Sequence, residues 1–135
     1  MAVVAALAMG ACGAAPAATP SSAPHATAPA SMPLEVSVTD AAALQVAGAY
    51  LLDVREPSEW AAGHIAGATL IPLGQLASRL GEVPRDRTVV TVCHTGNRSA
   101  QGRDILRQSG FVAVTSMTGG MNAWIAAGKP IVTGP

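Results

Sequence analysis

The run Thr88–Val92, Thr-Val-Val-Thr-Val, consists only of β-branched residues and carries no charge. A strand with one face in water alternates apolar and polar side chains, whereas a strand covered on both faces does not. Strands covered on both faces belong mainly to parallel sheets, in which helices lie on each side. The run therefore predicts a central strand of an α/β domain.

Similar short runs alternate with helix-like segments along the chain, which is the pattern of an α/β domain with a mainly parallel sheet. The expected strands are Glu35–Val38, Tyr50–Val54, Thr69–Ile71, Thr88–Val92 and Val112–Thr115. The chain has 135 residues, half of them hydrophobic, which is enough for one domain and a tail. We therefore expect one α/β domain over residues 34–135, with a five-stranded, mostly parallel sheet flanked by helices on both faces.

Helix signals lie between these strands. A first helix begins at a cap on Thr39 or Asp40 and runs to Ala47, and a second, Ala100–Ser109, is capped by Ser99. In the second helix small and apolar residues recur at helical spacing at Gly102, Ile105, Leu106 and Ser109. A last helix over Met121–Ala127 carries Trp124, which we expect in the core.

The stretch after the central strand places Cys93 at the carboxyl end of a buried strand, directly before a helix. Ligands of open α/β sheets bind at that edge, and a helix amino terminus there favours an anion. A thiolate held in this loop with Arg98 nearby is expected to have a lowered pKa. Gly96 allows a tight turn, so the loop amides can face inward. The expected anion-binding loop comprises His94, Thr95, Gly96, Asn97, Arg98 and Ser99.

A lone cysteine is most often a small buried hydrophobic residue. Here Cys93 is followed by five polar or flexible residues, Gly96 and Arg98 among them, and then by a helix cap. Such a loop would be a poor way to fill a core. We therefore interpret Cys93 as a nucleophile.

The segment Cys93-His94-Thr95-Gly96-Asn97-Arg98-Ser99 resembles the active-site loop of the rhodanese family. Further motifs of that family occur along the chain in the family's order. They are Asp53-Val54-Arg55-Glu56 with Glu59, Gly63-His64-Ile65, Gly67-Ala68, Ile71-Pro72, and Gly119-Gly120-Met121 before Ala123-Trp124. The resemblance covers about residues 35 to 130. It implies a rhodanese-like domain with the catalytic cysteine in a loop between a strand and a helix.

The resemblance also implies a reaction. The Cys93 thiolate attacks the outer sulfur of thiosulfate or a related donor, sulfite leaves, and cyanide or a thiol collects the sulfur from the Cys93 persulfide. Arg98 either neutralises the anionic donor or fastens the loop. Arg55 is a secondary candidate for the pocket, although a salt bridge to Glu59 or Glu56 is the favoured interpretation.

Two other residues of these motifs are interpreted as structural. Asp53, at the end of a strand, is expected to hold neighbouring backbone in place. His64 is expected to be hydrogen-bonded to the scaffold and to take no part in catalysis.

Two alternatives come from other classes of protein. Tyrosine phosphatases and arsenate reductases also set a cysteine and an arginine in an anion-binding loop, but with five residues between them, whereas four separate Cys93 from Arg98. The smaller ring of amides suits a sulfur atom better than phosphate. A persulfide carrier or binding module serving a protein partner, unknown from the sequence, is the second alternative.

Composition excludes several further functions. The formal net charge is zero and the chain has one Tyr, one Phe and two Trp, so neither a basic footprint nor a stacking platform for nucleic acid is expected. No Cys or His pair stands at zinc-ligand spacing, and we expect no metal and no cofactor. The expected partners are a small sulfur donor and a cyanide or thiol acceptor.

The amino-terminal part predicts export. Residues 1–12 are apolar and uncharged and end in Met9-Gly10-Ala11-Cys12, which resembles a bacterial lipoprotein signal with Cys12 as the lipidated residue. Residues 13–33 are rich in Ala, Pro, Ser and Thr, the composition of a disordered linker. We expect an exported protein anchored at a bacterial cell envelope; a simple cleaved signal is the other interpretation.

Overall fold

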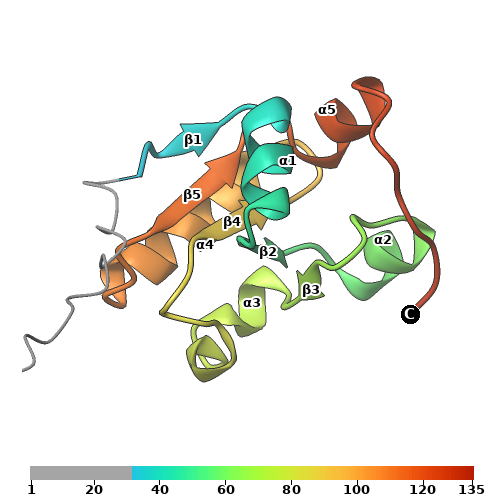
Figure 1. The fold of residues 1–135 in the computed structure, drawn as a ribbon. Helices are drawn as coiled ribbons and strands as arrows, with labels where there is room; N and C mark the ends of the chain where they lie inside the picture. Colours follow the sequence, from blue (N-terminus) through green and yellow to red (C-terminus); the bar gives the residue numbers. More distant parts are fainter. Residues whose placement is uncertain (1–31) are drawn as a thin grey trace, which may run out of the picture.

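A computed structural model describes residues 32–135 (Figure 1). The signal-like segment 1–12, Cys12 included, and all but the end of the expected linker lie outside the described residues. The strands are β1 (Glu35–Val36), β2 (Tyr50–Asp53), β3 (Thr69–Leu70), β4 (Val89–Val92) and β5 (Val114–Met117). The helices are α1 (Val38–Val46), α2 (Pro57–Ala62), α3 (Leu73–Leu76), α4 (Asn97–Gln108) and α5 (Gly120–Ala126), with a 3₁₀ turn η1 (Leu80–Glu82).

The five strands form one sheet in the order β1-β5-β4-β2-β3. Every pair of neighbouring strands is parallel. β4 lies in the middle, and each of its four residues is buried, as the charge-free run predicted. The expected single α/β domain with a five-stranded parallel sheet is confirmed.

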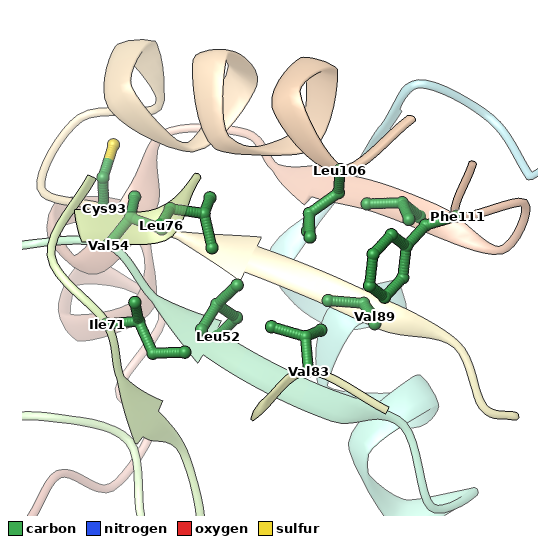
Figure 2. Packing of buried hydrophobic residues seen from close by; sticks show 10 residues of the cluster. Leu52, Val54, Ile71, Leu76, Val83, Val89, Cys93, Leu106 and Phe111 are labelled. Carbon is green, nitrogen blue, oxygen red and sulfur yellow. The ribbon is translucent and has the colours of Figure 1, made fainter. Parts of the chain in front are cut away.

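The two faces of the sheet bury different residues of the same strands. Val89 and Cys93 face the cluster under α3 and α4, together with Leu106 (Figure 2). Val90 and Val92 face the cluster under α1 and α5, where Trp124 is 2% exposed. Successive side chains of a strand point to opposite faces, so Cys93 continues the alternation of β4 on the α4 side. Trp124 lies in the core, as expected.

The first strand begins where the sequence predicted but ends earlier, and the first helix both begins and ends earlier. β1 ends at Val36, and Val38 belongs to α1. Ser37, rather than Thr39 or Asp40, is the cap, because its hydroxyl oxygen accepts a hydrogen bond from the Asp40 N–H at 3.1 Å. A cap at Ser37 satisfies one of the free amides of the first turn and starts the helix two or three residues sooner.

The last strand lies two residues further along than predicted. Val112 is 73% exposed and precedes β5, which runs Val114–Met117 with Met117 fully buried. The strand is set by its partners, since Val114 pairs with Val89 of β4 and Ser116 pairs with Glu35 of β1.

The other strands differ from the prediction by one residue at one end. β2 ends at Asp53, β3 ends at Leu70, and β4 begins at Val89. The flanking residues still take part in the pairing, since the Val54 amide donates to the Val92 carbonyl and Ile71 donates to Asp53.

The helix that follows Cys93 begins three residues earlier than predicted and ends one residue earlier. α4 begins at Asn97 with Gly96 as its cap, so Ser99 lies inside the first turn. Its buried residues are Ser99, Gly102, Arg103 and Leu106, so the buried stripe lies closer to the amino terminus than the predicted stripe. α5 begins at Gly120 and ends at Ala126, one residue earlier at each end than predicted.

Three short elements had no counterpart in the prediction: α2, α3 and η1. α2 carries a readable signal, because Pro57 follows Glu56 and the Glu56 and Glu59 side chains form a capping box. No helix in residues 32–135 has the length and apolar character needed to cross a membrane.

Candidate active-site loop

The loop that follows β4 turns back sharply at Gly96 to enter α4. Gly96 has φ of +112°, in the left-handed region predicted for it, where side chains other than glycine are strained. A Cβ atom at this position would also lie 3.2 Å from the Gly119 nitrogen. This turn places Cys93 beneath the amino terminus of α4 (Figure 2).

The Cys93 sulfur is held by hydrogen bonds within the loop. The Gly96 N–H donates to Cys93 Sγ at 3.0 Å, and Ser99 Oγ lies 3.5 Å from the same sulfur. Cys93 is 1% exposed, and this burial raises the pKa of the thiol. The hydrogen bonds of Ser99, Gly96 and Thr95 outweigh burial and hold the pKa of Cys93 below its ordinary value. The loop therefore favours a thiolate.

Ser99 contributes more than the sequence indicated. Instead of capping the helix from outside, it is fully buried in the first turn, where its hydroxyl also donates to the Gly96 carbonyl at 2.8 Å. One side chain thus contacts both the sulfur and the turn that positions it. The other loop side chains, His94, Thr95 and Asn97, are exposed.

The amino terminus of α5 supports the loop from the opposite side. The Met121 N–H donates to the Cys93 carbonyl at 2.7 Å, and the Asn122 N–H donates to the His94 carbonyl at 3.1 Å. Gly120 has φ of +56°, and a Cβ atom there would collide with the Cys93 carbonyl oxygen. The Gly119-Gly120 pair is therefore a positioning element of the loop. The sequence signalled it only as part of a family motif.

Arg98 is fastened to α2. Its guanidinium donates to both carboxylate oxygens of Glu59, at 2.8 and 2.7 Å. The hydrogen bond from Arg98 lowers the pKa of Glu59 to about 2, with burial opposing and the Glu56 N–H assisting. Glu59 therefore neutralises the positive charge of Arg98 that was expected near the Cys93 thiolate. Of the two roles considered for Arg98, fastening the loop is the one with a contact in the structure.

Arg55 forms a buried salt bridge, but with a different partner from those expected. Its guanidinium donates to both oxygens of Asp53, with 2.6 Å between Nη2 and Oδ2, and not to the side chains of Glu59 or Glu56. It also donates to the carbonyls of Glu59 and Gly63. Asp53 additionally accepts from the Arg55 N–H at 3.0 Å, so it holds neighbouring backbone as predicted. This pair ties the end of β2 to α2.

His64 is hydrogen-bonded to the scaffold, as expected. Its ring stacks on Trp60 with 3.6 Å between the centroids, and Nδ1 lies 3.0 Å from the Trp60 carbonyl oxygen. The backbone of His64 pairs with Val132, which draws the carboxyl-terminal segment alongside α2 (Figure 1).

A cavity of about 250 Å³ lies beside the loop, between α2 and α5. It is lined by Arg55, Glu59, Ala62, Gly63, His94, Met121, Asn122, Ile125 and Ile131. Arg55 therefore does border a pocket next to the loop, in addition to its salt bridge. Among residues 32–135 no group of three His, Cys, Asp or Glu side chains could hold a metal ion.

These features define the class of the molecule: an α/β protein with a cysteine, held by loop hydrogen bonds, between a central parallel strand and a helix. The model of the family described as Rhodanese-like domain matches residues 37–127. The chain belongs to the rhodanese-like family.

Three relatives illustrate the similarity. A sulfurtransferase of Allochromatium vinosum is 42% identical over 82 residues, covering 61% of this chain and 77% of the relative. The thiosulfate sulfurtransferase GlpE of Pseudomonas entomophila is 36% identical, covering 66% of this chain and 82% of that protein. The crystal structure of a rhodanese-related protein from Thermoplasma volcanium has a TM-score of 0.68 at 33% identity, covering 73% of this chain and 96% of that one.

Other relatives are matched over a smaller share of their length. The match covers 60% of a Bacillus subtilis relative and 21% of a Mycobacterium tuberculosis relative. Homologues named as sulfurtransferases support a rhodanese-type enzyme that works with a sulfur donor and a sulfur acceptor.

Proposed function

We propose that the protein is a thiosulfate sulfurtransferase that carries sulfur on Cys93. The single observation that carries the proposal is the thiol environment: Sγ accepts the Gly96 N–H at 3.0 Å, and the loop hydrogen bonds lower the pKa of Cys93. A thiolate is the form that attacks sulfur. The thiosulfate sulfurtransferase of Pseudomonas entomophila among the relatives supports the choice of donor.

The reaction has two balanced steps. The Cys93 thiolate attacks the outer sulfur of thiosulfate, a bond forms between the two sulfurs, and the bond to the sulfonate sulfur breaks to release sulfite. The product is a Cys93 persulfide, whose negative charge the loop amides can stabilise. Cyanide or a thiol then attacks the outer sulfur, and Cys93 leaves as a thiolate.

The hydrogen bonds of the Cys93 loop support sulfur transfer over phosphoryl transfer. The turn at Gly96 brings its amide to 3.0 Å from Sγ, so one of the few amides of the loop already donates its hydrogen bond to the sulfur. Arg98, which would neutralise a phosphate in the phosphatase alternative, is paired with Glu59. We propose that aryl phosphates are not substrates.

The test is the intact mass of the protein after incubation with thiosulfate and removal of the donor. The expected result is a gain of one sulfur atom, which disappears on addition of cyanide as thiocyanate forms. Cys93→Ser should fold and take up no sulfur, and it should release no sulfite from thiosulfate in the presence of cyanide. Wild-type turnover by the Ser variant would reject Cys93 as the nucleophile.

The same measurement separates a free-standing enzyme from a persulfide carrier. An enzyme completes many turnovers with cyanide or a small thiol. A carrier loads one sulfur and keeps it in the presence of these acceptors until its protein partner is added.

A further inference from the structure

The cavity between α2 and α5 takes no part in the two sulfur-transfer steps described above. Its volume is about 250 Å³. Among the residues that the structure describes, its lining includes His94, the residue that follows Cys93, but not Cys93 itself. Its wall and the sulfur loop are therefore built from adjacent residues. A group bound there therefore lies beside the loop that carries Cys93.

The walls of the cavity are mainly apolar. α5 contributes Met121 and Ile125, the end of α2 contributes Ala62, and the carboxyl-terminal segment contributes Ile131. Ile125 is 52% exposed and Ile131 is 38% exposed, so both present apolar surface to solvent at the opening. A ligand that covers these two side chains would bind more favourably, because it removes apolar surface from water.

The charged side chains of the cavity are already paired. The Arg55 guanidinium binds both oxygens of Asp53, and the Glu59 carboxylate binds Arg98. An anion such as thiosulfate would find no unpaired guanidinium there unless one of these bonds broke. A neutral, apolar group requires no such change. The charge pattern therefore selects against the anionic donor and in favour of an uncharged substituent.

We propose that this cavity binds the apolar substituent of an organic thiol that serves as the sulfur acceptor. The inference rests on the proposed function. The acceptor's thiolate attacks the outer sulfur of the Cys93 persulfide, a new sulfur–sulfur bond forms, and the bond to Cys93 Sγ breaks. The products are an organic persulfide and the Cys93 thiolate, while the substituent stays between Ala62 and Ile125.

The volume indicates the size of the substituent. An apolar cavity of about 150 Å³ binds benzene, so 250 Å³ accommodates a phenyl ring with one further methylene group. Benzyl mercaptan is a suitable probe, and 2-mercaptoethanol is its polar counterpart. Cyanide, which has no substituent, reports on sulfur transfer alone.

The experiment compares these three acceptors with thiosulfate as donor, by sulfite release. We expect kcat/KM for benzyl mercaptan to exceed that for 2-mercaptoethanol by about tenfold or more. Ala62→Phe fills the cavity and should lower the ratio of the benzyl mercaptan value to the cyanide value by about tenfold. Ala61→Phe is the matched control on the same helix, because Ala61 is exposed and does not line the cavity, and it should keep the ratio.

Two further measurements guard against a folding defect. Ile125→Ser removes apolar wall from a half-exposed position without crowding, and it should lower the same ratio. Benzyl alcohol, which has no thiol, should shift the methyl resonances of Ile125 and Ile131 in the wild type and in Ala61→Phe, but not in Ala62→Phe.

The outcomes distinguish the two proposals. Sulfite release with cyanide but equal kcat/KM for the two thiols would overturn the subsite and leave the proposed function in place. Unchanged methyl resonances with benzyl alcohol would also overturn the subsite. No sulfite release with any acceptor would overturn the proposed function, and the acceptor subsite with it.

Discussion

Replacing Ser99 with alanine tests whether the loop stabilises the thiolate through this side chain. Ser99 Oγ lies 3.5 Å from Cys93 Sγ, and its hydrogen bond lowers the pKa of Cys93. Alanine removes that bond and leaves burial, which raises the pKa of the thiol. The Gly96 carbonyl still accepts from the Ala100 N–H at 3.1 Å, so the change leaves no unpaired carbonyl there.

The magnitude follows from the strength of the lost bond. A hydrogen bond to a charged group contributes about 1.5–3 kcal/mol. The separation of 3.5 Å is long, which places this bond at the low end. Since about 1.4 kcal/mol corresponds to tenfold, Ser99→Ala should lower the acid dissociation constant of the Cys93 thiol by about tenfold.

The assay is the rate of alkylation by iodoacetamide at Cys93 as a function of pH, followed by peptide mass spectrometry so that Cys12 is counted separately. Ser109→Ala is the matched control, because it removes a hydroxyl that binds the Ile105 carbonyl at the far end of the same helix. The midpoint of the Ser99→Ala profile should move to higher pH, while that of Ser109→Ala should not. Coincident profiles for Ser99→Ala and the wild type would refute the reasoning.

Three further predictions concern the Glu59–Arg98 ion pair, the turn at Gly96 and the amino-terminal Cys12. The lowered pKa of Glu59, about 2 against 4.5, means that its pair with Arg98 stabilises the fold fully above pH 4.5 and loses this contribution as the pH falls towards 2. The difference in unfolding free energy between the wild type and Glu59→Gln, measured with urea, should therefore shrink over that window; a constant difference would contradict it. Gly96→Ala should destabilise the fold by about 1–2 kcal/mol, because φ is +112°, and Gly96→Val should cost more and lose more sulfite release, since a β-branched residue fits that conformation worst; equal activities would show that the turn tolerates a side chain. If Cys12 is lipidated, the wild type expressed in a bacterium should sediment with membranes and Cys12→Ser should not, whereas equal membrane retention would reject lipidation.

The sequence alone determined the kind of fold and the place of the site. A charge-free β-branched run predicts a strand covered on both faces, and β4 is buried at every residue. The polar, glycine-containing stretch after it predicts a turn into a helix, and Gly96 has the positive φ that this turn requires. These features are local in the chain, so the spacing of residue types is enough to find them.

Tertiary contacts decided which partner each site residue takes. Arg98 pairs with Glu59, 39 positions away in the chain, whereas Arg55 pairs with Asp53 and not with Glu56 or Glu59. The Arg98–Glu59 pairing depends on where α2 docks, which local residue patterns do not contain. α4 also begins earlier than the sequence predicted, because the buried contact of Ser99 with Cys93 places that serine in the first turn of the helix. The edges of β5 were likewise set by its neighbours β1 and β4, because strand limits follow from pairing and burial, which local residue patterns do not contain.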